Sequence, residues 1–133
     1  MPLKYIPDQG EIVICDFTRF GAPEITKIRP AIVISSMKKN VAKVCTVVAL
    51  STTEPRPVLS HHAVIKIDPP LRKPYDSPEV WVKGDMIYTL SISRLNRPSY
   101  RDSNGVKHFY QQIIGLKEFE KVEWCVRNWL NLF

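Results

Sequence analysis

The sequence predicts a mainly β (α+β) fold, a small barrel of antiparallel strands with one C-terminal amphipathic helix. Short runs rich in β-branched residues alternate with loops, and the 133 residues include 11 prolines but only 5 glycines. Apolar residues at clear helical spacing occur only near the C-terminus. Because the strands do not alternate with helices, an antiparallel sheet is favoured over a parallel one.

Five strands are expected before a terminal hairpin. In chain order they are Glu11–Phe17, Ala31–Ser35, Val41–Leu50, His62–Ile67 and a fifth made of Val80–Lys83 and Met86–Leu90. Pro30 suits the first position of the second strand, where the ladder needs no N–H donor. Gly84 interrupts the fifth strand and predicts a bulge. The pair Asn104-Gly105 is typical of a hairpin turn, here between Ser99–Arg101 and Val106–Gln111.

The terminal helix is predicted from apolar residues three and four positions apart. These residues are Leu116, Phe119, Val122, Val126, Trp129, Leu130 and Phe133. Such a stripe faces either the core or a partner. We expect the segment Trp129–Phe133 to be packed within the stripe rather than free.

Length and composition indicate one globular domain over residues 1–133, with 44% hydrophobic and 24% charged residues. No run approaches the roughly 18 apolar residues of a membrane span, and the N-terminus has no secretory signal. Cys15, Cys45 and Cys125 lack the spacing of disulfide frameworks or zinc sites. We expect them to be small buried groups in a reducing compartment. The expectation is a cytoplasmic protein without membrane contact, cofactor or metal.

The net charge of +6 is unevenly distributed. Residues 31–60 and 91–115 each carry four basic side chains and one acidic side chain, whereas the rest of the chain is balanced. If these two segments meet in space, they form a basic face suited to a polyanion such as nucleic acid.

A more specific pattern occupies the N-terminal third. It consists of Tyr5, Pro7-Asp8, Gly10–Val13, Asp16-Phe17, a loop with Glu24, and the run Arg29–Ser35. This pattern resembles the MazF/PemK family of bacterial toxins. The likeness continues at Val47–Thr52 and Val82–Asp85, and is weakest at Asp68–Glu79 and Asn96–Gly115.

The resemblance implies an SH3-like small barrel that forms a homodimer. It also implies metal-independent cleavage of single-stranded RNA at short sequences. The expected partners are therefore single-stranded RNA and a cognate antitoxin, whose disordered acidic tail would occupy the RNA groove.

Cleavage without a metal requires removal of the 2′-OH proton, stabilisation of the phosphorane charge and protonation of the leaving 5′-oxygen. Arg29 is the expected stabiliser, because a guanidinium binds phosphate bidentately and stays charged; alternatively, it forms a structural ion pair. Ser51 or Thr52 can donate to a phosphate oxygen, and the choice stays open because Ser51 stands where the family has threonine. Glu24 or Asp85 would move protons.

Lys83 and Asp85 resemble a basic–acidic pair of some family members, with lysine in place of arginine. In an extended strand, residues two apart point to the same face, which would place the two side chains together. The expected RNA-binding residues are Arg19, Phe20, Lys27, Arg56, His61 and Lys83. Phe20 would stack on a base. His61 or His62 would line the groove or lie in solvent.

Two alternatives stay open. One is a non-catalytic toxin that binds a protein, of the CcdB gyrase-poison type. The other is a small barrel that binds RNA without cleaving it, which the departures at Ser51 and Lys83 keep in consideration.

Overall fold

The computed structural model describes residues 2–22, 27–36 and 43–132. Within these ranges, six strands form one sheet in the order β4-β5-β3-β2-β1-β6, and β7 and β8 form a separate hairpin. The sheet strands are β1 (Ile12–Asp16), β2 (Ile28–Val33), β3 (Val44–Ser51), β4 (His62–Lys66), β5 (Glu79–Ser91) and β6 (Leu95–Asn96). The remaining elements are a 3₁₀ turn (Ile92–Arg94), β7 (Ser99–Arg101), β8 (Lys107–Phe109) and α1 (Leu116–Leu130).

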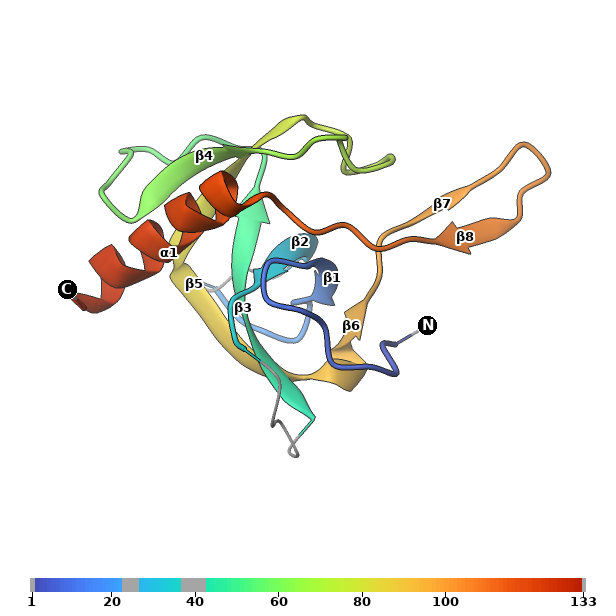
Figure 1. Ribbon diagram of the computed structural model, residues 1–133, viewed down its shortest axis with the longest axis horizontal. Coiled ribbons are helices and arrows are strands. Elements are labelled where there is room, and N and C mark those ends of the chain that lie inside the picture. The colour runs from blue at the N-terminus through green and yellow to red at the C-terminus, as the bar shows by residue number, and fades with distance from the viewer. Residues whose placement is uncertain (1, 23–26, 37–42, 133) are drawn as a thin grey trace.

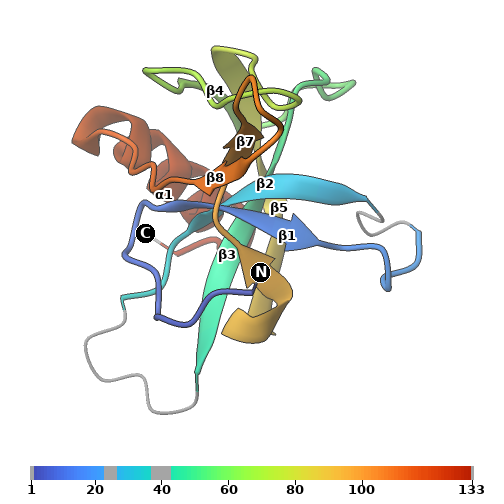
Figure 2. The ribbon, with the colours of Figure 1, turned by 90° about the vertical axis from the view of Figure 1, so that its right-hand side faces the viewer.

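The sheet is antiparallel and strongly curled, with α1 packed against β4 and β5 (Figure 1). The β7–β8 hairpin projects away from the body of the molecule (Figure 1). In the view turned by 90°, β1 and β2 lie side by side and cross the long strands β3 and β5 (Figure 2). The sheet is barrel-like but open, since no ladder joins β4 to β6 among the described residues. The mainly β prediction with a C-terminal helix is confirmed.

The second strand starts earlier than the sequence indicates, so Pro30 lies inside β2 rather than at its first position. The backbone pairs Phe17–Lys27 and Glu11–Val33 are hydrogen-bonded, so odd-numbered residues of β2 bond to β1. The nitrogen of Pro30 therefore faces β3. The absent N–H costs no ladder bond there, because the pairing of β2 with β3 begins only at Ala31.

Two hydrophobic clusters share this sheet. The first cluster is formed by the N-terminal segment, β1, β2, β3, β6 and the end of β5, and includes Val13, Phe17, Val47, Leu90 and Leu95. The second cluster lies against α1 and includes Ile12, Ile65, Val82, Val122 and Cys125. The side chains of β1, β2 and β3 alternate between the two, as the two faces of a sheet must.

Strand β5 changes the face that it presents to each cluster. Val80 and Val82 belong to the second cluster, whereas Met86 and Tyr88 pack against the first. All four residues have even numbers, and strict alternation would place them on one face of the strand. The alternation therefore slips by one position between Val82 and Met86. The ladder with β3 is irregular at the same place. The bulge predicted around Gly84 is thus confirmed.

Gly84 lies where three pieces of backbone meet. A Cβ at this position would lie 2.6 Å from the carbonyl oxygen of His61 and 2.7 Å from that of Cys125 in α1. The Gly84 N–H donates to the same His61 oxygen at 3.0 Å. Helix and strand therefore touch through backbone here, which only glycine permits.

Helix α1 buries less of its apolar stripe than expected. Val122 and Cys125 are buried, but Trp129 and Leu130 are about half exposed. The prediction that the final segment is packed is wrong for its described residues; Phe133 lies outside the described residues. The reason is that α1 crosses β4 and β5 and then continues past the edge of the sheet (Figure 1). Among the described residues, no helix combines the length and hydropathy that a membrane crossing requires.

Two local predictions are confirmed. Gly105 has a positive φ of 79° in the β7–β8 turn, and the Asp102 carboxylate accepts from the N–H groups of Asn104 and Val106. All three cysteines are buried and free. Burial raises their thiol pKa, for Cys15 to about 12, which keeps them protonated and inert.

A buried carboxylate fixes the N-terminal segment. Glu11 is completely buried. It accepts from the Tyr5 hydroxyl at 2.5 Å, the Asp8 N–H at 3.0 Å and the Gln111 side-chain amide at 3.0 Å. Burial and this carboxylate raise the pKa of the Tyr5 phenol. Three donors satisfy one buried charge and hold distant segments together.

Replacing Gly84 by alanine is expected to destabilise the fold by about 1–3 kcal/mol, because backbone atoms of His61 and Cys125 would have to move. Urea unfolding of the purified variant measures this loss. Gly21 is the matched control, because a Cβ there has no neighbour within 4 Å; Gly21→Ala should leave the unfolding midpoint nearly unchanged. Equal midpoints for both variants would contradict the close backbone contact.

Candidate nucleic-acid interface

The clearest pocket among the predicted site residues opens where β2 and β3 separate. Because their pairing stops at Ala31, the strand ends diverge and leave a space between Pro30 and Leu50. The space has a volume of about 190 Å³. Its lining residues are Arg29, Pro30, Leu50, Ser51, Thr52, Leu71, Pro74, Tyr75 and Val80, and we call it the Arg29 pocket.

Three predicted catalytic residues meet in the Arg29 pocket. Arg29 enters half-buried from β2, while Ser51 ends β3 and Thr52 follows it. The Ser51 Oγ accepts the N–H of Thr53 at 3.1 Å, which leaves its hydroxyl hydrogen available to donate. The pocket thus combines one guanidinium with two hydroxyl groups. This set suits a phosphate diester, whose oxygens only accept hydrogen bonds.

Tyr75 is a member of the pocket that sequence reasoning missed. Its hydroxyl lies 3.4 Å from the carbonyl oxygen of Ile28, at the start of β2. Burial raises the pKa of the Tyr75 phenol and the Arg29 charge partly opposes this rise. The phenol is therefore protonated at neutral pH, and its single O–H donates to the Ile28 carbonyl oxygen unless a ligand acceptor replaces it. No sequence pattern indicates this position, because Tyr75 lies in the loop where the family resemblance is weakest.

Asp85 lies in a different place from Arg29. Its carboxylate oxygens are 3.7 Å from His61 Nε2 and 3.9 Å from His62 Nε2. Lys83 and Asp85 form no ion pair within the described part of the chain, although the charges of both act on His62. Lys83 lies opposite His62 in the β4–β5 ladder. Neither residue lines the Arg29 pocket.

His61, His62 and Asp85 are the one group of three potential metal ligands within the described part of the chain, with ligand atoms within 4.8 Å of one another. However, the Leu59 N–H donates to His62 Nδ1 at 3.0 Å. In the neutral ring the proton then resides on Nε2, which faces Asp85. This tautomer favours a proton-donating contact with the carboxylate over metal ligation. Sequence spacing could not indicate the cluster, because its members come from two strands and a loop.

His61 is buried, contrary to the expectation of a groove-lining or solvent-exposed side chain. Its ring lies 4.9 Å from that of Trp129 in α1 and 4.2 Å from that of His62. Burial and the neighbouring His61 lower the pKa of His62, and Asp85 only partly opposes them. His62 is therefore uncharged at neutral pH.

The other predicted RNA-binding residues are spread over the surface. Arg19 and Phe20 line a hollow of about 520 Å³, which we call the Phe20 hollow. The Phe20 ring stacks on Tyr88 at 5.0 Å and has the Arg94 guanidinium 5.0 Å from its centroid, so it is already covered by protein groups.

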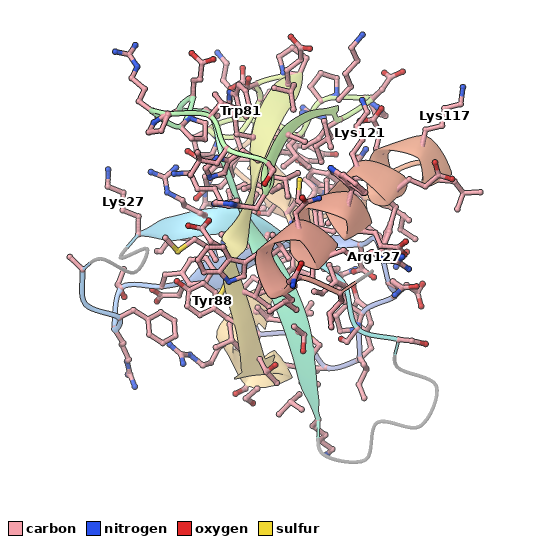
Figure 3. All side chains as sticks on the ribbon, turned by 90° about the vertical axis from the view of Figure 1, so that its left-hand side faces the viewer. Lys27, Trp81, Tyr88, Lys117, Lys121 and Arg127 are labelled. Atoms are coloured by element: carbon pink, nitrogen blue, oxygen red, sulfur yellow. The ribbon has the colours of Figure 1, made fainter. Side chains whose placement is uncertain are left out.

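Lys27 and Arg56, two further predicted RNA-binding residues, are exposed. Figure 3 shows Lys27 pointing outward at the start of β2. Glu24 lies outside the described residues.

Solved structures share this architecture. An endoribonuclease from a mycobacterial species in complex with its cognate antitoxin is 18% identical, with a TM-score of 0.65 over 96% of this chain and 98% of that one. MazF from Deinococcus radiodurans is 17% identical, with a TM-score of 0.64 over 97% and 100%. The Mycobacterium tuberculosis toxin MazF-mt6 is 15% identical, with a TM-score of 0.59 over 92% and 97%. At such identities, the likeness establishes a common fold.

A family model places the chain in a class. The model for the PemK-like, MazF-like toxin of type II toxin–antitoxin systems matches residues 8–126. No match was found among curated proteins. The chain belongs to the PemK/MazF toxin family, as its sequence pattern predicted. The matched range includes Arg29, Ser51, Thr52 and Tyr75, the polar side chains of the Arg29 pocket.

The stability of the protein is expected to fall as the pH decreases from about 7. The pKa of His62 is lower in the folded chain than its usual 6.5, so the unfolded chain binds this proton first and is favoured by acid. The loss begins near pH 6.5 and is complete below the lowered pKa. His62→Asn keeps an acceptor for the Leu59 N–H but cannot titrate. Urea unfolding between pH 7.5 and 5.5 should show a weaker pH dependence for this variant; identical slopes would contradict the assignment.

Proposed function

We propose that this chain is a sequence-selective endoribonuclease toxin that cleaves single-stranded RNA without a metal ion. The reaction is in-line attack of a ribose 2′-OH on the adjacent phosphorus, giving a 2′,3′-cyclic phosphate and a free 5′-OH. The observation that carries the proposal is the Arg29 pocket, where one guanidinium and three hydroxyl groups surround a space of about 190 Å³. Membership of the toxin family supports it.

Arg29 is the proposed stabiliser of the phosphorane. The charge on the non-bridging oxygens grows as the 2′-oxygen attacks, and a fixed guanidinium binds that charge more tightly than the starting diester. Strand β2 holds Arg29 through its pairing with Cys15 of β1, so the charge is positioned before substrate arrives. Ser51 and Thr52 donate to the same oxygens. The protonated Tyr75 phenol is a further donor to the phosphate or to the leaving oxygen.

Proton removal from the 2′-OH needs a base outside this set. No carboxylate or imidazole lines the Arg29 pocket among the described residues. Of the two predicted carriers, Asp85 faces His61 and His62 instead. We therefore assign proton transfer to Glu24, with Asp85 holding the histidines in orientation.

We further propose that the protein acts in the cytoplasm as a homodimer that a cognate antitoxin neutralises. Two of the structurally similar proteins were solved with antitoxins, the mycobacterial endoribonuclease and MazF from Deinococcus radiodurans in a MazE–MazF complex. The net charge of +6 suits an acidic partner. Trp124, Trp129 and Leu130 leave a large apolar surface exposed on α1, which is typical of a protein–protein contact.

Arg29→Ala is expected to reduce RNA cleavage by at least about 10²-fold, because the phosphorane loses its charged partner. Purified protein is incubated with a long, mostly unstructured RNA in EDTA, and the cut ends are mapped. Wild-type protein should give discrete cuts with cyclic-phosphate ends. Arg127→Ala is the matched control, since it removes an exposed arginine from α1 (Figure 3), and it should cleave like wild type.

Three outcomes would change the proposal. Full activity of Arg29→Ala at an unchanged melting temperature would exclude the mechanism. RNA binding without product from wild-type protein would favour the binding-only barrel. Gyrase-dependent DNA cleavage, with no effect on RNA, would favour the CcdB type.

A further inference from the structure

We propose that a hollow between β6 and the β7–β8 hairpin holds the base of an RNA nucleotide next to the scissile phosphate, with Asn96 reading that base. This subsite rests on the proposed ribonuclease function and adds a specificity-determining residue to it. The hollow has a volume of about 270 Å³. We call it the Asn96 hollow.

The Asn96 hollow adjoins the Arg29 pocket. Pro74 and Tyr75 line both spaces. The Asn96 hollow also adjoins the Phe20 hollow, because Asn96 lines both spaces. Three spaces thus follow one another across the molecule, joined by shared residues. An extended RNA strand with its phosphate at Arg29 would place a neighbouring nucleotide in the middle space.

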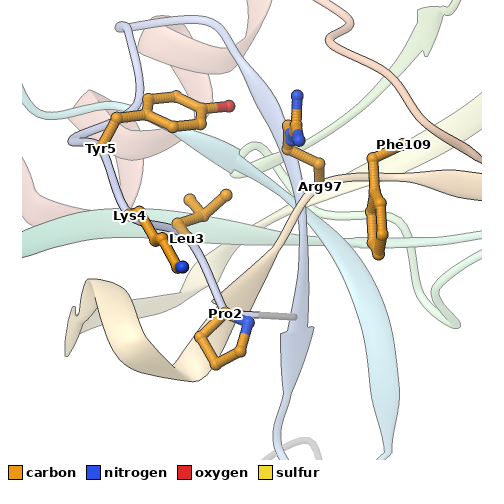
Figure 4. Close-up of a pocket in the computed structure, with 6 residues that line it drawn as sticks. All are labelled: Pro2, Leu3, Lys4, Tyr5, Arg97 and Phe109. Carbon is orange, nitrogen blue, oxygen red and sulfur yellow. The ribbon is translucent and has the colours of Figure 1, made fainter.

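The walls of the Asn96 hollow carry positive charge and aromatic rings. Arg72, Arg97 and Lys107 line it, and none of its described lining residues is acidic. The Phe109 ring lies 5.6 Å from the Arg97 guanidinium and 5.2 Å from the Lys107 ammonium. Figure 4 shows Arg97 standing between Tyr5 and Phe109, in the adjoining space that Arg97 and Phe109 also line. Cations beside an aromatic face form the combination that binds single-stranded nucleic acid.

Asn96 supplies the polar group that a base requires. Its side-chain oxygen Oδ1 is buried and has no hydrogen-bond partner. Buried polar atoms are nearly always paired, so the unpaired oxygen of a side chain that lines this hollow suits a ligand donor once the amide turns toward the space. The N–H groups on a base edge are such donors. Asn96 is held in β6 opposite Ile14, and Pro2 bridges to it from the N-terminal segment. Its position is therefore rigid enough for discrimination.

The combination favours RNA over an acidic peptide. The carboxylates of an acidic peptide would pair with Arg97 or Lys107, and its backbone N–H groups could donate to Asn96, but neither group supplies a flat ring to stack beside Phe109. A nucleotide can contact the cations, the aromatic ring and the amide oxygen of the hollow. Its phosphate binds the cations, its base stacks on Phe109, and the edge of the base donates to Asn96.

The test compares base preferences between Asn96→Asp and wild type. A set of short labelled RNAs varies one base at a time on either side of a fixed cleavage site, and relative cleavage rates are measured. A carboxylate keeps an acceptor for the base N–H but loses the amide donor and adds a negative charge, so base edges that present donors gain and edges that present acceptors lose. We expect the preference at one flanking position to change by about tenfold or more, while preferences at other positions stay as in wild type.

Lys107→Ala provides a second variant that leaves β6 untouched. It should weaken cleavage of all RNAs alike and reduce the salt dependence of binding, because it removes a phosphate contact without base information. Lys117→Ala, at the start of α1 (Figure 3), removes an exposed lysine far from the hollow. It is the matched control and should behave as wild type in both measurements.

Binding gives a readout that does not need catalysis. Fluorescence anisotropy with the same RNAs, in an Arg29→Ala background, should show the same change of base preference on Asn96→Asp. An unchanged preference in a variant with normal melting would overturn the subsite, while cleavage by wild type would leave the proposed function standing. Cleavage lost but base-dependent binding retained would overturn only the ribonuclease proposal. Absence of both cleavage and binding would overturn both.

Discussion

One strand serves two hydrophobic cores, and the backbone contact at Gly84 makes this possible. Before the bulge, β5 directs Val82 toward α1; after it, Tyr88 points to the opposite face. After the slip, Asp85 faces His61, which precedes β4, and His62, which begins β4. Because α1 rests on Gly84 through its own backbone, the helix can approach β5 more closely than side chains would permit. The curvature of the sheet, the seat of the helix and the histidine cluster all depend on this one position.

The candidate site arises from a second backbone constraint, the missing N–H of Pro30. Strands that stay paired leave no space between them, whereas β2 and β3 part where proline faces β3. Arg29 and Ser51 then stand on two diverging strands with a pocket between them. Their positions are fixed by the sheet on either side, so little reorganisation is needed when phosphate binds. A rigid cation on a strand end is an economical way to bind a polyanion selectively.

The sequence indicated the fold well because strand patterns and the terminal helix are local properties. The family resemblance also predicted that Arg29 and Ser51 belong to one site, and both line the same pocket. Sequence reasoning missed Tyr75 and the burial of His61, since each depends on which distant segment packs over it. The ion pair expected between Lys83 and Asp85 does not form among the described residues, where the bulge at Gly84 interrupts strict alternation. The sequence pattern could not show that α1 continues past the sheet. Apolar residues have the same spacing on a helix whether they face the core or a partner protein.

The buried Glu11 carboxylate couples the order of synthesis to the order of folding. One of its donors, Gln111, is 100 positions further along the chain. Until that residue has left the ribosome, closing the N-terminal segment over Glu11 would bury a carboxylate that lacks one of its three donors. Strand β1 also lacks its second paired strand until β6 has been synthesised. The N-terminal third, which carries Arg29, therefore reaches its final packing only when nearly the whole chain has been made, and contacts of such long range slow folding.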